Sequence, residues 1–244
     1  MKIPNNIIVT WKDSNIPSYV IPNIKKLNPE KKILFFTDED VVRFLSEEYD
    51  SSYVDFFHGI KRGCNKGDFF RYCYLYKRGG YYSDIDVKHR EPIKNYISSD
   101  IDFFSVLSMG QGHIFQALLY CVSGHPVIKR CIKDMMSEQA QLDIILNTTS
   151  DMYKNVSKFI GRKKLVPGTT YKWGNTPTRP DGQNIRLAKE VKLDGEWACV
   201  YMNTIIAMSR YPNYDQKSGF LSFEGVSPEH QWYANKYKGI FKVE

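Results

Sequence analysis

Short apolar runs alternate with helically spaced apolar residues along the first part of the chain. The apolar runs are rich in isoleucine, valine and phenylalanine, which favour buried strands, whereas apolar residues three and four positions apart favour helices. The expected elements, in order, are a strand at 7–10, a helix at 18–27, a strand at 33–36 and a helix at 37–45. Thr37 suits the N-cap of the last helix, because Asp40 follows three residues later. This order predicts an α/β fold with a mostly parallel central sheet flanked by helices.

The remainder of the chain shows similar patterns, with less regularity in residues 139–190. A helix at 66–77 should end at Gly79-Gly80, since glycine is common just past a helix C-terminus. Residues 114–122 are apolar and should pack against the sheet, and 166–182 are rich in loop residues. The other expected strands are at 81–87, 103–107, 198–202 and 204–208, and the other expected helices are at 127–136 and 152–160. We see no repeat or linker, so we expect one domain over residues 1–244.

Composition narrows the class of protein. The net charge of +7 is spread along 244 residues without a dense basic arm, which suits nucleotide diphosphates or an anionic membrane surface and argues against nucleic acid. The five cysteines include no Cys-x-x-Cys pair, which argues against zinc and a disulfide framework and favours reduced thiols. We find no signal peptide or long apolar run. We therefore expect a cytoplasmic protein whose membrane contact, if it has any, is peripheral.

Asp84 and Asp86 stand two positions apart, just after Gly79-Gly80 and an aromatic pair. Side chains two apart on a strand point to the same side, so a strand at 81–87 would bring both carboxylates to one divalent cation. Mg²⁺ and Mn²⁺ prefer oxygen ligands and often bind through one or two carboxylates plus substrate phosphates. The pair predicts a metal-dependent enzyme with a nucleotide-linked substrate; the alternative is two chance aspartates on a solvated loop.

The surrounding residues make the interpretation more specific. The pattern Lys66-x-Asp68-x-x-Arg71-x-x-x-Leu75, followed by Gly79-Gly80-x-Tyr82-x-Asp84-x-Asp86, resembles the sugar-binding region of the DXD-containing glycosyltransferases of family 32. These include initiating α-1,6-mannosyltransferases and capsular polysaccharide sugar transferases, and they are related to the clostridial glucosylating toxins. The segments Thr10-Trp11-Lys12 and Phe36-Thr37-Asp38-Glu39-Asp40 also resemble this family. The close similarity covers roughly the first 90 residues.

The resemblance implies a GT-A fold with a Rossmann-like, mostly parallel sheet. It implies transfer, with retention, of a hexose from a UDP- or GDP-sugar to a glycan, lipid-linked sugar or protein acceptor. It also implies Mn²⁺ or Mg²⁺ as cofactor. Residues 1–90 would bind the donor nucleotide and the metal, and residues 91–244 would form the acceptor side and a C-terminal closing loop.

The same resemblance assigns roles to individual residues. Asp86 would bind the metal, and Asp84 would do so directly, through water or by binding ribose. Arg71 would hold phosphate or sugar oxygens, and Asp68 would accept hydrogen bonds from the sugar hydroxyls. Thr10 and Trp11 would contact the donor, with Trp11 stacked on the base, and Tyr82 would position the ribose or pack below the metal loop. The alternatives are a surface ion pair for Asp68 and Arg71, and core packing for Trp11 and for Tyr82.

Three further candidates lie outside the first 90 residues. His230 would be a third metal ligand from a C-terminal loop, and Trp232 would lie near the leaving oxygen; the alternative is a solvated histidine beside a packing tryptophan. Gln116 would hydrogen-bond the reacting centre or the acceptor, or else be a core residue with one polar contact. His125, in a Gly-His-Pro turn, is expected to be structural.

Two other classes of protein stay open. A nucleotidyltransferase or phosphohydrolase would also need a metal, but the glycines form no phosphate-binding loop. A catalytically inactive sugar-nucleotide binding protein would have no need to keep all four of the residues Asp68, Arg71, Asp84 and Asp86.

Overall fold

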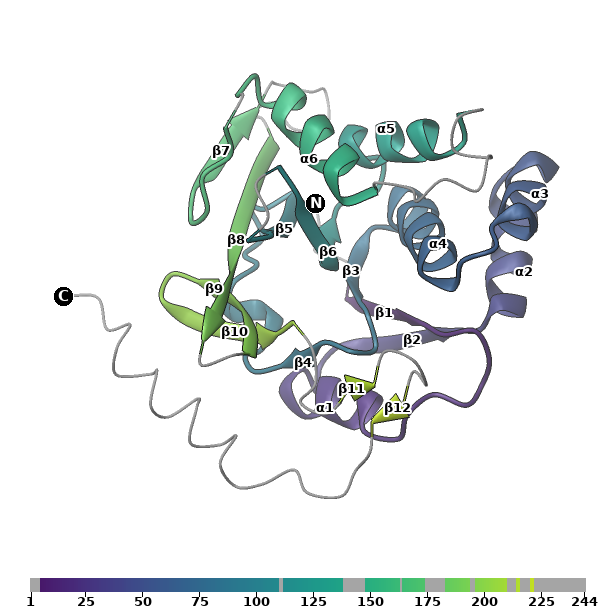
Figure 1. Ribbon diagram of the computed structural model, residues 1–244, viewed down its shortest axis with the longest axis horizontal. Helices are drawn as coiled ribbons and strands as arrows, with labels where there is room; N and C mark the ends of the chain where they lie inside the picture. The colour runs from purple at the N-terminus through teal and green to yellow at the C-terminus, as the bar shows by residue number, and fades with distance from the viewer. Residues whose placement is uncertain are drawn as a thin grey trace.

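The structure is a computed structural model that describes residues 5–109, 112–137, 148–162, 164–173, 183–193, 196–209, 214–215 and 220–221. A curled ten-stranded sheet runs through its centre (Figure 1). Its strands lie in the order β2-β1-β3-β6-β5-β8-β9-β10-β4, with β7 paired to β8. The strands are β1 (Asn6–Thr10), β2 (Lys32–Phe36), β3 (Gly80–Ser83), β4 (Lys88–His89), β5 (Phe103–Leu107), β6 (Ile114–Cys121), β7 (Thr170–Trp173), β8 (Gln183–Leu193), β9 (Glu196–Tyr201) and β10 (Thr204–Met208).

The described helices follow the predicted alternation in the first half of the chain. They are α1 (Val20–Leu27), α2 (Asp38–Glu48), α3 (Ser51–Gly59), α4 (Gly63–Arg78), the short 3-10 helix η1 (Ile93–Asn95), α5 (Pro126–Met135) and α6 (Thr148–Phe159). A separate pair of short strands, β11 (Tyr214–Asp215) and β12 (Phe220–Leu221), completes the described elements. Thr37 caps α2 as predicted, and its capping box with Asp40 is complete. No helix in the described ranges is long and apolar enough to cross a membrane.

The α/β class is confirmed, but the sheet is mixed rather than mostly parallel. Strand β1 pairs in parallel with β2 and β3, and β5 pairs in parallel with β8. Strand β6 runs antiparallel between β3 and β5, and the later strands β7, β9, β10 and β4 also form antiparallel pairs. The short connections from β8 to β9 and from β9 to β10 explain part of this difference, because only antiparallel neighbours can be joined by a tight turn.

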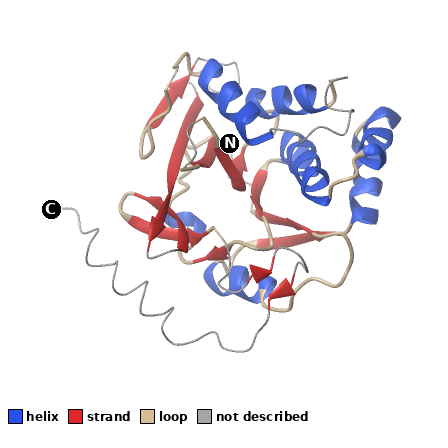
Figure 2. Ribbon diagram, viewed as in Figure 1, coloured by secondary structure: helices blue, strands red, loops and turns tan. Residues whose placement is uncertain are grey.

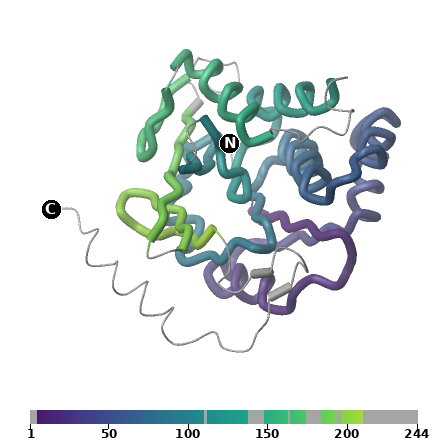
Figure 3. Tube along the Cα trace, in the orientation of Figure 1, coloured from purple at the N-terminus to yellow at the C-terminus, as the bar shows by residue number. Residues whose placement is uncertain are grey.

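Alternating strand residues place a hydrophobic cluster on each face of the sheet. Ile8 and Tyr82 pack into the cluster under α2 to α6, whereas Ile7 and Tyr81 pack into the cluster that contains α1 and residues 85–101. This is the two-residue period expected of a sheet covered on both faces. Figure 2 shows helices on both sides of the strands, and Figure 3 shows the purple and blue N-terminal part beside the green strands of the later part.

Several elements differ from the sequence prediction. The predicted strand 81–87 ends at Ser83, and residues 84–87 form a turn. Residues 114–122, expected to pack against the sheet, are largely β6 and lie within it. Helix α3 and strands β4, β7 and β8 were missing from the prediction, and β7 lies in the segment expected to be rich in loop residues. The sequence hides β8 because charged residues interrupt its apolar positions, although Ile185 and Leu187 are buried.

Gly79-Gly80 ends α4 as predicted and turns the chain directly into β3. Gly79 is the C-cap with φ of 63°, and Gly80 has φ of +123°. A Cβ atom on Gly80 would lie 2.7 Å from Oδ1 of Asn6 and 2.9 Å from Cδ1 of Ile8. Only glycine therefore allows this turn to approach β1 so closely. As a result, the end of α4 and the start of β3 are held beside β1.

Candidate active site

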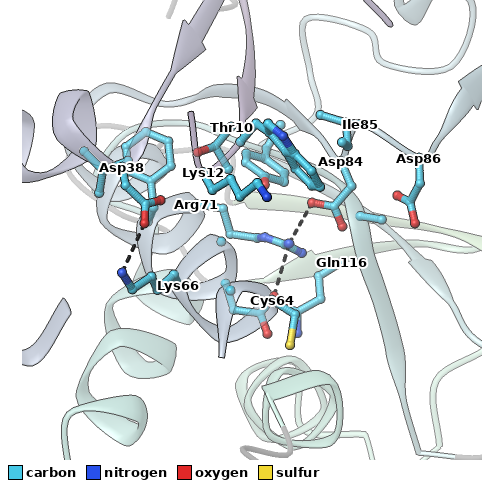
Figure 4. A pocket seen from close by; sticks show the side chains of 18 of the residues that line it. Thr10, Lys12, Asp38, Cys64, Lys66, Arg71, Asp84, Ile85, Asp86 and Gln116 are labelled. Carbon is cyan, nitrogen blue, oxygen red and sulfur yellow. Dashed lines mark hydrogen bonds and ion pairs between the residues drawn. The ribbon is translucent and has the colours of Figure 1, made fainter. Parts of the chain in front are cut away.

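A cavity of about 500 Å³ lies where β1, β2 and β3 end, as expected for a ligand site in an α/β sheet. Residues from the ends of these strands, from α2 and α3, from the first half of α4, from strand β6 and from the start of α6 line it. Figure 4 shows their side chains gathered around Arg71. The lining contains all the donor-region residues predicted from sequence, namely Thr10, Trp11, Asp68, Arg71, Tyr82, Asp84 and Asp86, and also Gln116.

Arg71 is the cation at the centre of this cavity. Its side chain is 5% exposed, and one terminal nitrogen lies 3.1 Å from Oδ1 of Asp68 and 2.8 Å from Oδ1 of Asp84. Burial opposes its charge, but the carboxylate of Asp84, together with Tyr82 and Asp68, raises its pKa. Its Nε is buried and has no hydrogen-bond partner in the described residues. Arg71 is thus a fixed cation whose Nε still has a hydrogen to donate.

Asp68 lies one helical turn before Arg71 on α4, but the two do not form a surface pair. The side chain of Asp68 is 13% exposed, and its Oδ2 accepts a 2.6 Å hydrogen bond from the hydroxyl of Thr148. Burial raises the pKa of Asp68, while Arg71 and Thr148 act in the opposite direction. A buried carboxylate with two fixed partners is held in one orientation, as an acceptor of substrate hydrogen bonds must be.

Asp84 and Asp86 both line the cavity, although they do so from a turn rather than a strand. The amide of Asp84 still bonds to the carbonyl of Ala117 on β6, and the amide of Val87 then bonds to the carbonyl of Asp84, which closes the turn. The alternation of side chains along a strand, on which the prediction rested, is therefore not what brings the two carboxylates to the site. Figure 4 shows the Asp84 carboxylate beside Arg71 and Asp86 farther along the same edge.

The charges around the cavity fit a divalent cation bound together with an anionic substrate. Three cations and four carboxylates among the described lining residues give a formal charge of 3 − 4 = −1: Lys12, Lys66 and Arg71 against Asp38, Asp68, Asp84 and Asp86. A nucleoside diphosphate would meet net repulsion here unless a cation accompanied it. Asp84 and Asp86 offer the oxygen ligands that Mg²⁺ and Mn²⁺ prefer. The described residues contain no group of three or more His, Cys, Asp or Glu suited to a metal.

The first strand supplies one wall of the cavity. The hydroxyl of Thr10 donates to the carbonyl of Phe36, and the backbone of Trp11 bonds to the same carbonyl. Trp11 lines the cavity and also packs against the core cluster on the α1 side, so the donor-stacking and core interpretations both describe part of its surroundings. Its indole nitrogen is buried with no hydrogen-bond partner in the described part of the chain.

Tyr82 lies below Arg71. Its ring is 1% exposed, and the guanidinium carbon of Arg71 lies 4.5 Å from the ring centre. Burial and the nearby Asp84 raise the pKa of Tyr82, so the phenol stays neutral. This position supports the packing role predicted for Tyr82, through a cation–π contact that also helps to orient Arg71.

Gln116 lines the cavity but uses both ends of its amide in the interior. Its Oε1 accepts from the hydroxyl of Tyr72, and its Nε2 donates to the hydroxyl of Thr148 at 2.8 Å. The side chain is almost fully buried. It is therefore more than a core residue with one polar contact, and its observed contacts lead toward Asp68 rather than toward an acceptor.

His230 and Trp232 lie outside the described residues, so their predicted roles stay predictions. His125 is fully buried, and its ring packs at a tilt against Phe103, with ring centres 5.2 Å apart, which agrees with a structural role. His89 is buried with its Nε2 2.9 Å from the hydroxyl of Ser83, directly before the aspartate turn.

Several lining residues were not predicted from sequence. Lys66 pairs with Asp38 at 3.1 Å, and Lys12 and Cys64 also face the cavity. Lys66 and Asp38 belong to segments that resemble the glycosyltransferase family in sequence. This resemblance could have identified both residues. Thr149, which lines the cavity, and Thr148, which contacts Asp68, had no such signal, since only the tertiary fold brings the start of α6 to α4.

Comparisons with known proteins agree with this site. Residues 6–104 match the family model described as "Glycosyltransferase sugar-binding region containing DXD motif". Inositol phosphoceramide mannosyltransferase 1 of Schizosaccharomyces pombe is 33% identical over 103 residues, which are 40% of this chain and 32% of that protein. An uncharacterized glycosyltransferase of Acanthamoeba polyphaga mimivirus is 28% identical over 156 residues, 60% of this chain and 61% of that protein.

A third relative is the initiation-specific alpha-1,6-mannosyltransferase of Saccharomyces cerevisiae, which is 30% identical over 108 residues, 40% of this chain and 22% of that protein. The chain thus spans between about a fifth and three fifths of the length of these curated relatives.

Among solved structures, the "PaToxG Glycosyltransferase" superposes with a TM-score of 0.50 at 13% identity, covering 64% of this chain and 68% of that one. This likeness concerns the fold alone, and with the mixed α/β sheet it confirms the predicted GT-A class. Residues 6–104, which carry Asp68, Arg71, Asp84 and Asp86, are thus the part of the chain that is similar to glycosyltransferases whose sugar-binding region contains a DXD motif.

Proposed function

We propose that the protein is a metal-dependent, retaining glycosyltransferase that transfers a hexose from a UDP- or GDP-sugar to a glycan, lipid-linked sugar or protein acceptor. The observation that carries this proposal is the buried position of Arg71 between Asp68 and Asp84, in a cavity at the carboxyl ends of the strands. A surface ion pair would need no such burial. A cation fixed in a cavity that also presents carboxylate oxygens can bind both the phosphates and the hydroxyls of one substrate.

Each group has a distinct task in this proposal. Arg71 binds a phosphate or sugar oxygen and holds the donor in one orientation, since its planar guanidinium fixes direction as well as charge. Asp68 accepts hydrogen bonds from hydroxyls of the donor sugar. Trp11 offers an aromatic face to the base. Because these groups are already fixed by packing, donor binding requires little rearrangement of the site.

Asp84 and Asp86 are the residues that would hold Mn²⁺ or Mg²⁺. When bound, such an ion neutralises the charge that develops on the departing nucleoside diphosphate. Arg71 keeps one oxygen of Asp84 in place, so the same cation orders both the metal-binding carboxylate and the sugar-binding carboxylate. His230 stays a proposed third ligand.

The relatives suggest which donor to test first. Two of them are named as mannosyltransferases, one acting on inositol phosphoceramide and the other initiation-specific. GDP-mannose therefore heads the panel of donors, followed by UDP-glucose, UDP-galactose and UDP-N-acetylglucosamine. An inositol-containing sphingolipid and an oligomannoside are the first acceptors.

The test begins with thermal unfolding of the protein with each donor, with and without Mn²⁺, because a ligand that binds the native state raises its apparent stability. Slow transfer to water should then release a nucleoside diphosphate and a free hexose. Release of a nucleoside monophosphate would indicate a phosphohydrolase instead. Binding without turnover, on any acceptor tried, would indicate an inactive sugar-nucleotide binding protein. The anomer of the product, followed by proton NMR, tests retention.

Asp86→Asn tests the metal assignment. We expect loss of turnover by at least about a hundredfold with an unchanged melting temperature, because the change removes a charge from the metal site and keeps the shape of the side chain. Asp55→Asn is the matched control, since Asp55 is exposed on α3 and does not line the cavity. Equal Mn²⁺-dependent turnover in the Asp86 and Asp55 variants would reject Asp86 as a metal ligand.

A further inference from the structure

A chain of buried hydrogen bonds leads from α4 through β6 and α6 back to α4. The residues in it are Tyr72, Gln116, Thr148 and Asp68. Asp68 belongs to the motif described above, whereas the other three are buried and do not. We propose that Thr148 is a positioning residue, held by Gln116 and Tyr72, that fixes the Asp68 carboxylate for the donor sugar. This inference rests on the proposed function, in which Asp68 accepts hydrogen bonds from sugar hydroxyls.

The donor and the acceptor of every hydrogen bond in this series follow from its two end residues, Asp68 and Tyr72. An ionised Asp68 can only accept, so the single proton of the Thr148 hydroxyl points to Oδ2 of Asp68, at 2.6 Å. The oxygen of Thr148 is then free to accept from the amide nitrogen of Gln116, at 2.8 Å. The amide oxygen of Gln116 must in turn accept, and the hydroxyl of Tyr72 donates to it.

Tyr72 consequently decides which way the amide of Gln116 faces. If this amide turned over, its oxygen would face Thr148 and compete with Asp68 for the one proton of that hydroxyl. The phenol of Tyr72 prevents this by donating to the amide oxygen, and burial raises its pKa, so the proton stays on the phenol. Tyr72 and Asp68 are both on α4, and the chain of hydrogen bonds therefore closes on one rigid helix.

Each oxygen of the Asp68 carboxylate has its own partner. Oδ1 contacts Arg71 at 3.1 Å and Oδ2 accepts from Thr148. Without Thr148, Arg71 remains tied to Asp84, but the Asp68 carboxylate would be held only through Oδ1 and could turn about its χ2. Loss of the Thr148 hydroxyl should therefore weaken recognition of the sugar while leaving recognition of the nucleoside diphosphate intact.

Thr148→Val tests this separation, because valine has the shape of threonine without the hydroxyl. With Mn²⁺ present, calorimetric titration gives the Kd of GDP-mannose against GDP, and of UDP-glucose against UDP. We expect the affinity for the nucleotide sugar to fall about tenfold, as for the loss of a hydrogen bond to a charged group, while the nucleoside diphosphate affinity stays within about twofold. Thr148→Ser keeps the hydroxyl and should restore sugar affinity. Thr170→Val, an exposed site on β7, is the control.

Equal weakening of both ligands would show a merely structural role, and unchanged affinity for the nucleotide sugar would also overturn the proposal. Tyr72→Phe provides a second test that does not depend on the folding of the valine variant. It should reduce the affinity for the nucleotide sugar but not for the nucleoside diphosphate, by a smaller factor than Thr148→Val does. An unchanged affinity for the nucleotide sugar would show that Tyr72 plays no part in positioning Asp68. If the wild-type protein binds no nucleotide sugar, the proposed function itself fails. If it binds and Thr148→Val keeps the ratio of the two affinities, only the role of Thr148 fails.

Discussion

Replacing Arg71 with methionine removes the cation between two carboxylates while keeping an unbranched side chain of comparable bulk. Asp68 and Asp84 would then face each other's charge in a largely buried site, with Tyr82 below them. Removing one partner of a buried ion pair costs roughly 3–5 kcal/mol, because the remaining charge is left uncompensated. For a domain of this size, the loss corresponds to a melting temperature lower by roughly 6–20 °C.

The loss should depend on pH in a defined direction. Burial already raises the pKa of Asp68, and Arg71 is the main influence that lowers it, so the variant raises this pKa further. A carboxyl whose folded-state pKa is raised stabilises the fold below its unfolded pKa, and this contribution disappears as the pH rises through the folded pKa. Arg71→Met should therefore be most destabilising near pH 8. Near pH 5 the variant should lose less stability than near pH 8. The difference is about 1.4 kcal/mol for each unit by which the substitution raises the pKa of Asp68 between pH 5 and pH 8.

Urea unfolding at pH 5 and pH 8 measures both effects. The double variant Asp68→Asn with Arg71→Met removes one of the two facing charges and should recover much of the stability at pH 8. A free energy of unfolding that is the same in Arg71→Met and the wild type would refute the reasoning. So would a loss that does not depend on pH, or a double variant no more stable than Arg71→Met alone.

Two other predictions concern the frame of the site. Burial lowers the pKa of His125 to about 3, from 6.5, so its stabilising contribution is complete above pH 6.5 and is lost as the pH falls toward 3. His125→Phe should remove about 2–3 kcal/mol of the acid sensitivity between pH 7.5 and 4.5, measured by urea unfolding; an undiminished acid sensitivity would contradict this. Gly80→Ala forces a Cβ against Asn6 at a positive φ and should cost about 1–3 kcal/mol. Gly59→Ala, where no atom lies within 4 Å of the added carbon, is its control, and equal melting temperatures for the two variants would count against the argument.

The parts of the site that lie close together in sequence were predictable. The pattern from Asp68 to Asp86 covers one helix, one glycine turn and one short strand, so its spacing determines much of its geometry. The capping box of Thr37 and the glycine stop at Gly79 are similarly local, and both are confirmed. The strand expected around Asp84 is the exception. Aspartate has low β propensity, and the turn closed by Val87 replaces extended structure there.

Contacts between distant segments could not be derived in the same way. Thr148 lies 80 residues from Asp68, and no periodicity links the two positions. Strand β8 was missed because its charged residues conceal a pattern of burial that only the neighbouring strands create. The mixed direction of the sheet has the same origin, since the position of β6 between β3 and β5 depends on pairing partners rather than on the residues of β6 alone.

The glycine turn between α4 and β3 also bears on the order in which the protein folds. Arg71 and Asp84 are separated by 13 residues, so their ion pair needs the closure of only a short loop, whereas Thr148 reaches Asp68 across 80 residues. During synthesis, the cation and both of its carboxylate partners are available well before the start of α6 leaves the ribosome. The charged centre can thus assemble first on a growing chain, and the orientation of Asp68 is completed only when α6 docks.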